Sequence, residues 1–257
     1  MQSHSAPHRA TAEQKAAFAR TGAVAVRKAV PRAQIDRIHR DLLEWLVQAP
    51  DDPDAIAAYT RRTFAEDMSE RPEILALFYD SPLVDLASSL VEPLELENVE
   101  RAQVQVRLPE RAGGAAQPEK PVHVDGLWCG HLPSGTLNSF SMLVGIAASQ
   151  VATSSGPLRF IPGGHLLVAD WIRTHGDAPP GDGYEAPEPI RTKLSQNFVA
   201  EPGDAIILHY LCPHAAGLNR LPNPRVMIYF RLKVVDHDGR VLLADPFADF
   251  PSLRRNG

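Results

Sequence analysis

The sequence predicts an α+β fold in which a helical N-terminal region precedes a sandwich or barrel of antiparallel strands. Apolar residues recur at helical spacing in the first hundred residues, whereas from residue 99 onward apolar and polar residues alternate as they do in strands. Short strand-like runs separated by Gly- and Pro-rich turns follow. We therefore expect one domain of 257 residues, with a mainly helical region 1–98, a core 99–235 and a C-terminal tail 236–257.

The N-terminal region carries the start and stop signals of helices. Thr11 and Gln14 form a capping-box pattern, and Gly22 is suited to end the helix that follows. Apolar periodicity predicts three further helices, one of them starting at Pro31, and a short apolar run predicts a strand before them. These segments are 22–30 for the strand and 31–48, 71–79 and 82–91 for the helices.

The core begins with a strand that alternates strictly. From Gln103 to Leu108 the valines and the leucine lie on one face, and the glutamines and the arginine lie on the other. Further strands are expected at 140–147, 158–161, 205–210 and 225–235. The stretch 174–190 has no periodicity, and a loop of that length in a compact domain is usually a lid or a binding loop.

Composition excludes several classes of protein. There are 26 basic and 31 acidic residues, so the net charge of −5 lacks the basic excess of a nucleic-acid binder. No apolar run is long enough for a transmembrane helix, and the first residues lack the apolar core of a secretion signal. The two cysteines cannot build a disulfide framework. We expect a cytoplasmic protein that acts on a small molecule without binding nucleic acid or membranes.

The ten histidines justify a search for a metal site. His123 and Asp125 are two residues apart, so on a strand both side chains point to the same face and can bind one ion. A His-x-Asp triplet alone is weak, and the alternative is a solvated polar turn. His214, after the strand AIILHY and a proline, is the best third ligand. Two histidines and one carboxylate leave open positions, which suits non-haem Fe(II).

Arg225 opens an apolar strand eleven residues after His214. An arginine buried there needs an anionic partner, and its planar guanidinium matches a carboxylate. A small dicarboxylate held by Arg225 at one end could reach the metal with the other, as a 2-oxo acid co-substrate requires. The alternative is an internal salt bridge to an aspartate or glutamate.

Three blocks of the sequence resemble the phytanoyl-CoA dioxygenase family of Fe(II)/2-oxoglutarate-dependent oxygenases. They are His123-Val-Asp125, SSGPLRFIPGGH at 154–165 and GDAIILHYLCPHAAGLNRLPNPR at 203–225. The resemblance covers residues 12–235 and implies a double-stranded β-helix, a form of jelly roll, behind an N-terminal helical region. It also implies Fe(II), 2-oxoglutarate and O2 as the cofactor and co-substrates.

Carried over by position, the resemblance makes His123, Asp125 and His214 the iron ligands and Arg225 the residue that binds the distal carboxylate of 2-oxoglutarate. It gives Asn219 a structural role in the turn between His214 and Arg225. The sequence departs from the family pattern at Gly145, where an aromatic residue is common, at Gln150, where an acidic one is, and at Pro162–His165, which reads Pro-Gly-Gly-His. The loss of bulk at Gly145 would widen the pocket.

Several polar and aromatic residues are weaker candidates. Arg225, Met227, Tyr229 and Arg231 share one face of the last strand, so Tyr229 could contact the substrate or be a core aromatic. Gln105 is a candidate for the co-substrate, and Gln103 and Trp128 are candidates for the substrate. The remaining residues we interpret as buried thiols, structural or non-ligand histidines, and solvated arginines; they are Cys129, Cys212, His131, His165, His209, Arg61 and Arg62.

The sequence thus favours an oxygenase that hydroxylates a small molecule, such as a natural product, with release of succinate and CO2. The presence of Asp125 supports oxygenation, since family members that halogenate have a small residue in its place. Two alternatives are a noncatalytic jelly-roll binding module and a cupin-like metalloenzyme that does not use 2-oxoglutarate.

Overall fold

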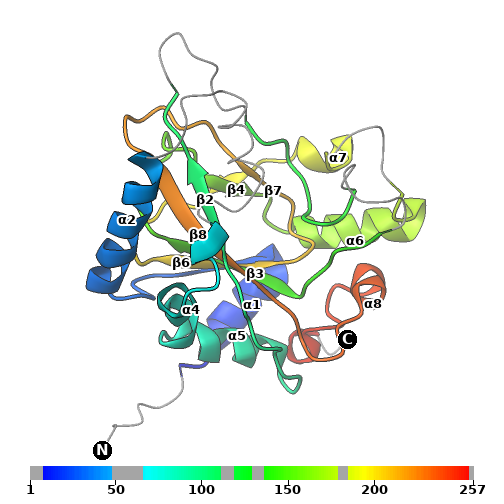
Figure 1. Ribbon diagram of the computed structural model, residues 1–257. Coiled ribbons are helices and arrows are strands. Elements are labelled where there is room, and N and C mark those ends of the chain that lie inside the picture. Colours follow the sequence, from blue (N-terminus) through cyan, green and yellow to red (C-terminus); the bar gives the residue numbers. More distant parts are fainter. Residues whose placement is uncertain (1–7, 48–65, 111–118, 129–135, 179–184, 255–257) are drawn as a thin grey trace, which may run out of the picture.

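The computed structural model describes residues 8–47, 66–110, 119–128, 136–178 and 185–254 (Figure 1). Helices α1, α2, α4 and α5 lie along one side of a core of antiparallel strands, and α6, α7 and α8 lie at the other end. The α+β class predicted from the sequence is confirmed.

The N-terminal helices begin and end close to where the sequence places them. In α1 (Ala12–Thr21) the Thr11 side chain accepts a hydrogen bond from the Gln14 backbone, and the Gln14 side chain completes the capping box. Gly22 ends that helix in the left-handed conformation, with φ 73°. The other bounds are β1 Ala23–Val26, α2 Arg32–Val47, the 3-10 helix η1 Glu66–Met68, α4 Pro72–Tyr79 and α5 Leu83–Val91.

Two antiparallel sheets form the core. The larger has the strand order β1-β6-β3-β8-β2, and the smaller has the order β5-β4-β7. Their bounds are β2 Gln103–Arg107, β3 Met142–Ala147, β6 Ala205–His209, β8 Arg225–Leu232, β4 Leu158–Phe160, β5 Gln196–Asn197 and β7 His214–Ala216. All strand pairs within the sheets are antiparallel, as the alternation in the sequence predicts.

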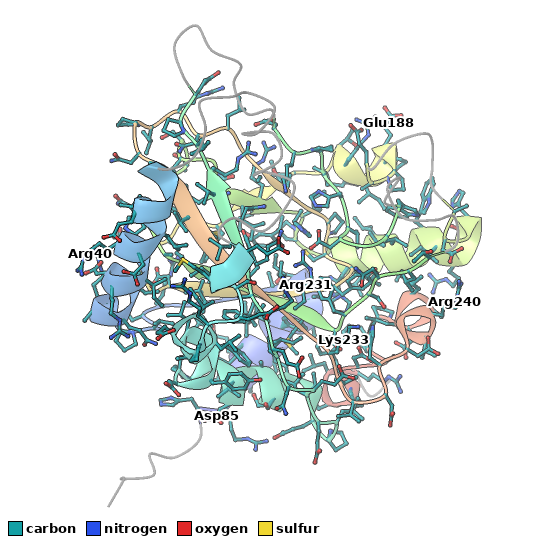
Figure 2. All side chains as sticks on the ribbon, in the orientation of Figure 1. Arg40, Asp85, Glu188, Arg231, Lys233 and Arg240 are labelled. Carbon is teal, nitrogen blue, oxygen red and sulfur yellow. The ribbon has the colours of Figure 1, made fainter. Side chains whose placement is uncertain are left out.

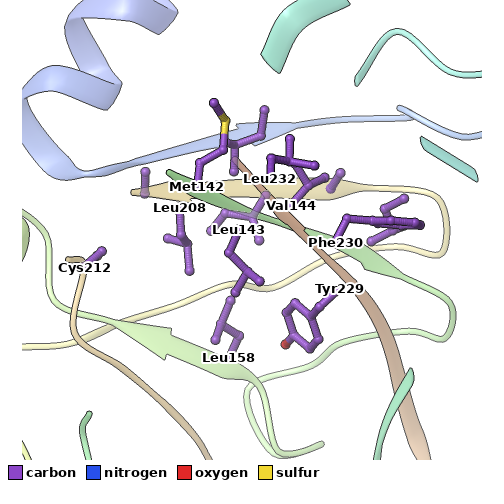
Figure 3. Close-up of a cluster of buried hydrophobic side chains, with 14 of the residues drawn as sticks. Met142, Leu143, Val144, Leu158, Leu208, Cys212, Tyr229, Phe230 and Leu232 are labelled. Atoms are coloured by element: carbon purple, nitrogen blue, oxygen red, sulfur yellow. The ribbon is translucent and has the colours of Figure 1, made fainter. Parts of the chain in front are cut away.

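Side-chain alternation divides the large sheet into two faces (Figure 3). Met142, Val144 and Leu232 point to one side, toward the helices, while Leu143 and Tyr229 point to the other, where Leu158 of the small sheet meets them. All six are buried. The inner face lies between the two sheets and is buried. Polar side chains on this face are therefore candidates for a functional site.

The structure also contains elements that the sequence did not predict. They are the helices α6 Gly164–His175, α7 Glu188–Arg191 and α8 Gly239–Ala244, the 3-10 helices η1 and η2 (Pro251–Leu253), and the short strands β5 and β7. The expectation of a structureless stretch at 174–190 is therefore wrong at both ends, because α6 continues to His175 and α7 begins at Glu188. Among the described residues, no single helix is long and apolar enough to cross a membrane; only the bent pair α4 and α5 meets that test together.

Candidate metal centre

A backbone bridge brings His123 and His214 side by side. The His123 N–H donates to the His214 carbonyl and the reverse bond forms as well, both at 2.9 Å. The two residues are thus directly opposed in an antiparallel pair, so their side chains point to the same face. Their ring centroids are 4.7 Å apart, and both residues are buried at the inner face of the jelly roll.

Asp125 completes the cluster from the same segment as His123. Its Oδ1 lies 3.3 Å from His123 Nε2 and 3.8 Å from His214 Nε2. One ligand atom from each of the three residues lies within 4.8 Å of the others, which is the arrangement of a candidate metal site. The turn after Asp125 requires glycine, because Gly126 has φ +66° and a Cβ there would lie 1.9 Å from the Asn138 carbonyl oxygen.

Both histidines present the ring nitrogen that a metal needs. His123 Nδ1 lies 2.8 Å from the Pro121 carbonyl oxygen, and His214 Nδ1 lies 3.0 Å from that of Cys212. A carbonyl can only accept, so each Nδ1 carries a hydrogen and Nε2 is the ring atom that faces Asp125. Metal-binding histidines are commonly oriented in this way, and the residues present therefore fit a divalent metal.

Electrostatics keep the cluster in a form able to bind a metal. Burial would raise the pKa of Asp125, but Arg231 and the two histidines outweigh burial and hold this pKa well below its usual range. Burial, followed by the neighbouring His123, lowers the pKa of His214 to about 4. At neutral pH the cluster thus offers a charged carboxylate and a neutral His214 imidazole.

Arg225 lies on the same inner face, and 1% of its surface is exposed. Its Nε and Nη2 donate to the Gly156 carbonyl at 2.9 and 2.7 Å, and its Nη1 donates to Gln105 Oε1 at 3.3 Å. Among the described residues, no carboxylate lies within ion-pair distance of Arg225, so the alternative of an internal salt bridge finds no support there. Burial lowers the pKa of Arg225.

Three more cations, not singled out as site residues by the sequence, surround the centre. Arg107 is paired with Arg225 across β2 and β8 and is as deeply buried. Burial, and then Arg225, lower its pKa to about 10. Burial lowers the pKa of Lys120 to about 8, although Asp125 opposes this shift. Arg231 Nη2 lies 2.7 Å from Asp125 Oδ2. In the sequence, Arg231 could be linked to the site only because it shares one face of the last strand with Arg225.

The other sequence candidates divide between a hollow and the core. Gln103 and Tyr229 line a hollow of about 420 Å³ together with Arg231. The Tyr229 hydroxyl lies 3.4 Å from Met227 Sδ, and burial raises the pKa of Tyr229. Trp128 is buried and has φ 57°, and its indole N–H has no hydrogen-bond partner among the described residues. Trp128 is therefore a buried donor beside the Asp125 turn.

The structure shows the surroundings of Gly145 and Gln150, where the sequence departs from the family pattern, and of Asn219. The expectation that Gly145 widens the pocket is wrong, because the Tyr229 ring occupies the space. Gln150 bonds to Glu201 at the surface, 3.3 Å away. Asn219 has the structural role that we expected: it is buried, and its Nδ2 donates to the carbonyls of Arg107 and Asn223.

Cys212 is a buried free thiol, as interpreted from the sequence, and burial raises its pKa to about 12. His165 and His209 also lie outside the metal cluster, bonded to the carbonyls of Ala19 and Pro246. The remaining interpretations, for Cys129, His131, Arg61 and Arg62, fall outside the described residues.

Comparison with known proteins places this geometry in context. Residues 18–227 match the family model described as phytanoyl-CoA dioxygenase (PhyH). No curated protein matches the chain. The chain is similar in fold to the non-heme alpha ketoglutarate dependent epimerase SnoN from nogalamycin biosynthesis, with 16% identity, a TM-score of 0.61 and coverage of 86% of this chain and 79% of that one.

Two further solved structures share the fold. The carbocyclase SnoK, also from nogalamycin biosynthesis, has 17% identity, a TM-score of 0.62 and coverage of 87% of this chain and 83% of that one. EctD from S. alaskensis has 19% identity, a TM-score of 0.61 and coverage of 92% and 80%. Other structures of EctD contain bound Fe, or 2-oxoglutarate with 5-hydroxyectoine.

Proposed function

This chain belongs to the phytanoyl-CoA dioxygenase family of Fe(II)/2-oxoglutarate-dependent oxygenases, and on that basis we propose that it hydroxylates a small molecule with release of succinate and CO2. Its iron ligands in this proposal are His123, Asp125 and His214, within the segment 99–235 that we propose as the catalytic core. The supporting observation is the convergence of two Nε2 atoms and one carboxylate oxygen within 4.8 Å.

When bound to this centre, Fe(II) supplies the activation of O2 and the oxidative decarboxylation of 2-oxoglutarate. The protein's own part is to hold the reactants. Arg225 binds the distal carboxylate of 2-oxoglutarate through its guanidinium, whose contacts within the described residues are Gln105, the Gly156 carbonyl and the Tyr229 side chain. Gln105 fixes the guanidinium and adds an amide contact to the co-substrate. The burial of both side chains strengthens these interactions by excluding water.

The substrate takes the hollow lined by Gln103, Tyr229 and Arg231. The hollow adjoins the centre, because Arg231 contacts Asp125 directly. Gln103 offers an amide for hydrogen bonding, and Tyr229 offers an aromatic edge. Trp128 contributes its indole N–H, which has no partner in the described part of the chain, from the turn that carries Asp125. A site of this composition suits a compact, partly polar organic molecule.

Tailoring of a natural product or other small metabolite is the reaction class that we propose. Its support is analogy of fold alone: SnoN and SnoK come from nogalamycin biosynthesis, and EctD has been solved with 5-hydroxyectoine.

The proposal is tested first without a substrate. Anaerobic addition of Fe(II) and 2-oxoglutarate is expected to produce a weak visible charge-transfer band, which His214→Ala abolishes. A panel of small molecules is then screened by succinate release, with product masses recorded, and the expected product gains one oxygen atom. A noncatalytic module would give no band. A metalloenzyme that does not use 2-oxoglutarate would bind iron without the band, and either result would overturn the proposal.

A further inference from the structure

The two oxygens of Asp125 have different partners. Oδ1 faces the two histidines, at 3.3 Å from His123 Nε2 and 3.8 Å from His214 Nε2. Oδ2 instead accepts a hydrogen bond from Arg231 Nη2 at 2.7 Å. A carboxylate can bind a metal through one oxygen or through both. Here one oxygen faces the metal position, and the other is engaged in a short charge-assisted hydrogen bond.

Arg231 is held in place from several directions. It lies near the end of β8 on the inner face, opposite Leu143 of β3, and its guanidinium carbon lies 5.5 Å from the centre of the Phe140 ring. Figure 2 labels it near the centre of the view, and its side chain is 38% exposed. The Asp125 side chain is only 16% exposed, so water competes weakly for Oδ2.

Open positions at the metal are limited. With a six-coordinate metal and 2-oxoglutarate bound, His123, Asp125 and His214 would take three positions and the 2-oxo acid two more, which would leave one. If Asp125 bound through both oxygens, this last position would be closed. The oxygen that would have to bind for this to happen is Oδ2, which already accepts the hydrogen bond from Arg231.

We propose that Arg231 is a positioning residue that keeps Asp125 a one-oxygen ligand and thereby keeps the last metal position open for O2. This inference rests on the proposed function, because it presupposes iron and 2-oxoglutarate at the centre. Arg231 also lines the substrate hollow, so a bound substrate contacts the residue that sets how Asp125 binds the metal.

Lys233 provides a matched control. It lies two residues beyond Arg231 and lines the same hollow, and Lys233→Gln likewise removes one positive charge. Within the described part of the chain, Lys233 makes no ion pair with Asp125. A general effect of charge would therefore appear in both variants, whereas an effect on Asp125 would appear only at Arg231.

The decisive measurement is the crystal structure of the Co(II)-loaded protein, which needs no turnover. The wild type and Lys233→Gln are expected to bind the metal through one oxygen of Asp125, and Arg231→Gln through both. Arg231→Lys, which retains a cationic donor, is expected to restore one-oxygen binding. Two-oxygen binding in the wild type, or one-oxygen binding in Arg231→Gln, would overturn the inference. Two-oxygen binding in the wild type would decide against the inference even if the variant fails to fold.

Kinetics with Fe(II) give an independent readout. Arg231→Gln is expected to raise the KM for O2 at least tenfold, while the Kd for 2-oxoglutarate changes less than threefold. An equal loss in 2-oxoglutarate binding would mean that Arg231 acts elsewhere. If the wild type shows no metal and no 2-oxoglutarate band, the proposed function itself fails, whereas two-oxygen binding with an intact band defeats only the role of Arg231.

Discussion

The ring of Tyr229 fills the space in which a side chain on Gly145 would lie. The two residues are direct cross-strand partners in β3 and β8. A Cβ on Gly145 would come 2.7 Å from Tyr229 Cε1 and 3.0 Å from Cδ1, well inside van der Waals contact. A small residue on one strand thus leaves room for the aromatic ring on the next, which lines the hollow shared with Gln103.

Gly145→Ala is therefore expected to displace the Tyr229 ring and to destabilise the protein by about 1–3 kcal/mol, as overpacking of a core does. Denaturant unfolding measures this change. In a Tyr229→Leu background the same Gly145→Ala change should cost at least about 1 kcal/mol less, because the clashing ring is gone. Equal costs in the two backgrounds would show that the ring does not set the constraint.

Arg225 is expected to determine the affinity for 2-oxoglutarate. Removing one partner of a buried charged pair costs on the order of 2–5 kcal/mol, so Arg225→Ala should weaken 2-oxoglutarate binding by about a hundredfold or more. Isothermal titration of the Fe(II)-loaded protein under anaerobic conditions measures this effect, and the affinity for Fe(II) should be unchanged. Arg159→Ala is the control, since that side chain is paired with Glu119 at 3.4 Å on the outer side of β4. Unaltered binding in Arg225→Ala would favour a metalloenzyme without a 2-oxo acid.

Stability should fall in mild acid because of buried neutral histidines. Burial lowers the pKa of His165 to about 4 in the folded state, against 6.5 as the ordinary value. Above pH 6.5 neither state is protonated at His165, so this residue adds no pH dependence. Between pH 6.5 and 4 only the unfolded state takes up the proton, and the free energy of unfolding should fall by about 3 kcal/mol.

Denaturant unfolding across that pH range measures the slope. His165→Gln should reduce the slope by the equivalent of about one bound proton, and the other histidines whose pKa burial lowers, His209, His214 and His39, contribute to the remainder. An unchanged slope in the variant would mean that His165 is protonated in the folded state.

A buried relay ties the C-terminal segment to the chain just before β3. His237 Nδ1 donates to Asp249 Oδ2 at 2.7 Å, and His237 Nε2 lies 2.8 Å from the Ser139 hydroxyl. Ser141 donates to the same carboxylate oxygen at 2.6 Å. Asp249→Ala leaves these donors unsatisfied and should cost about 3 kcal/mol in unfolding experiments. Asp177→Ala, which breaks an exposed pair with Arg240, should cost less than about 1 kcal/mol. Similar costs for the two variants would contradict a structural role for the relay.

The relay also bears on the metal centre, because Asn138 next to Ser139 donates its N–H to the Gly126 carbonyl at 3.2 Å. Asp249→Ala should loosen the packing around Ser139 and thereby weaken Co(II) binding. Asp177→Ala should leave Co(II) binding unchanged.

Much of this protein follows from local pattern alone. The capping box at Thr11, the amphipathic period of α2 and the alternation in β2 each depend on residues a few positions apart, which is why the sequence predicts them. The residues of the candidate centre could be predicted for the same reason. His123 and Asp125 are two residues apart on an extended segment, and His214 and Arg225 belong to one sequence block. The helix α6 was missed because its Pro-Gly-Gly-His start carries no side-chain cap.

What only the tertiary structure decided is which side chains meet across strands. A period of two tells which face a residue takes but not which residue lies opposite, because the register depends on pairing between distant segments. Register places Arg107 beside Arg225 and Tyr229 beside Gly145, and the fold brings Arg231 to the second oxygen of Asp125. The sequence determined the chemical groups of the centre, whereas the packing of the sheets determined their orientation and their neighbours.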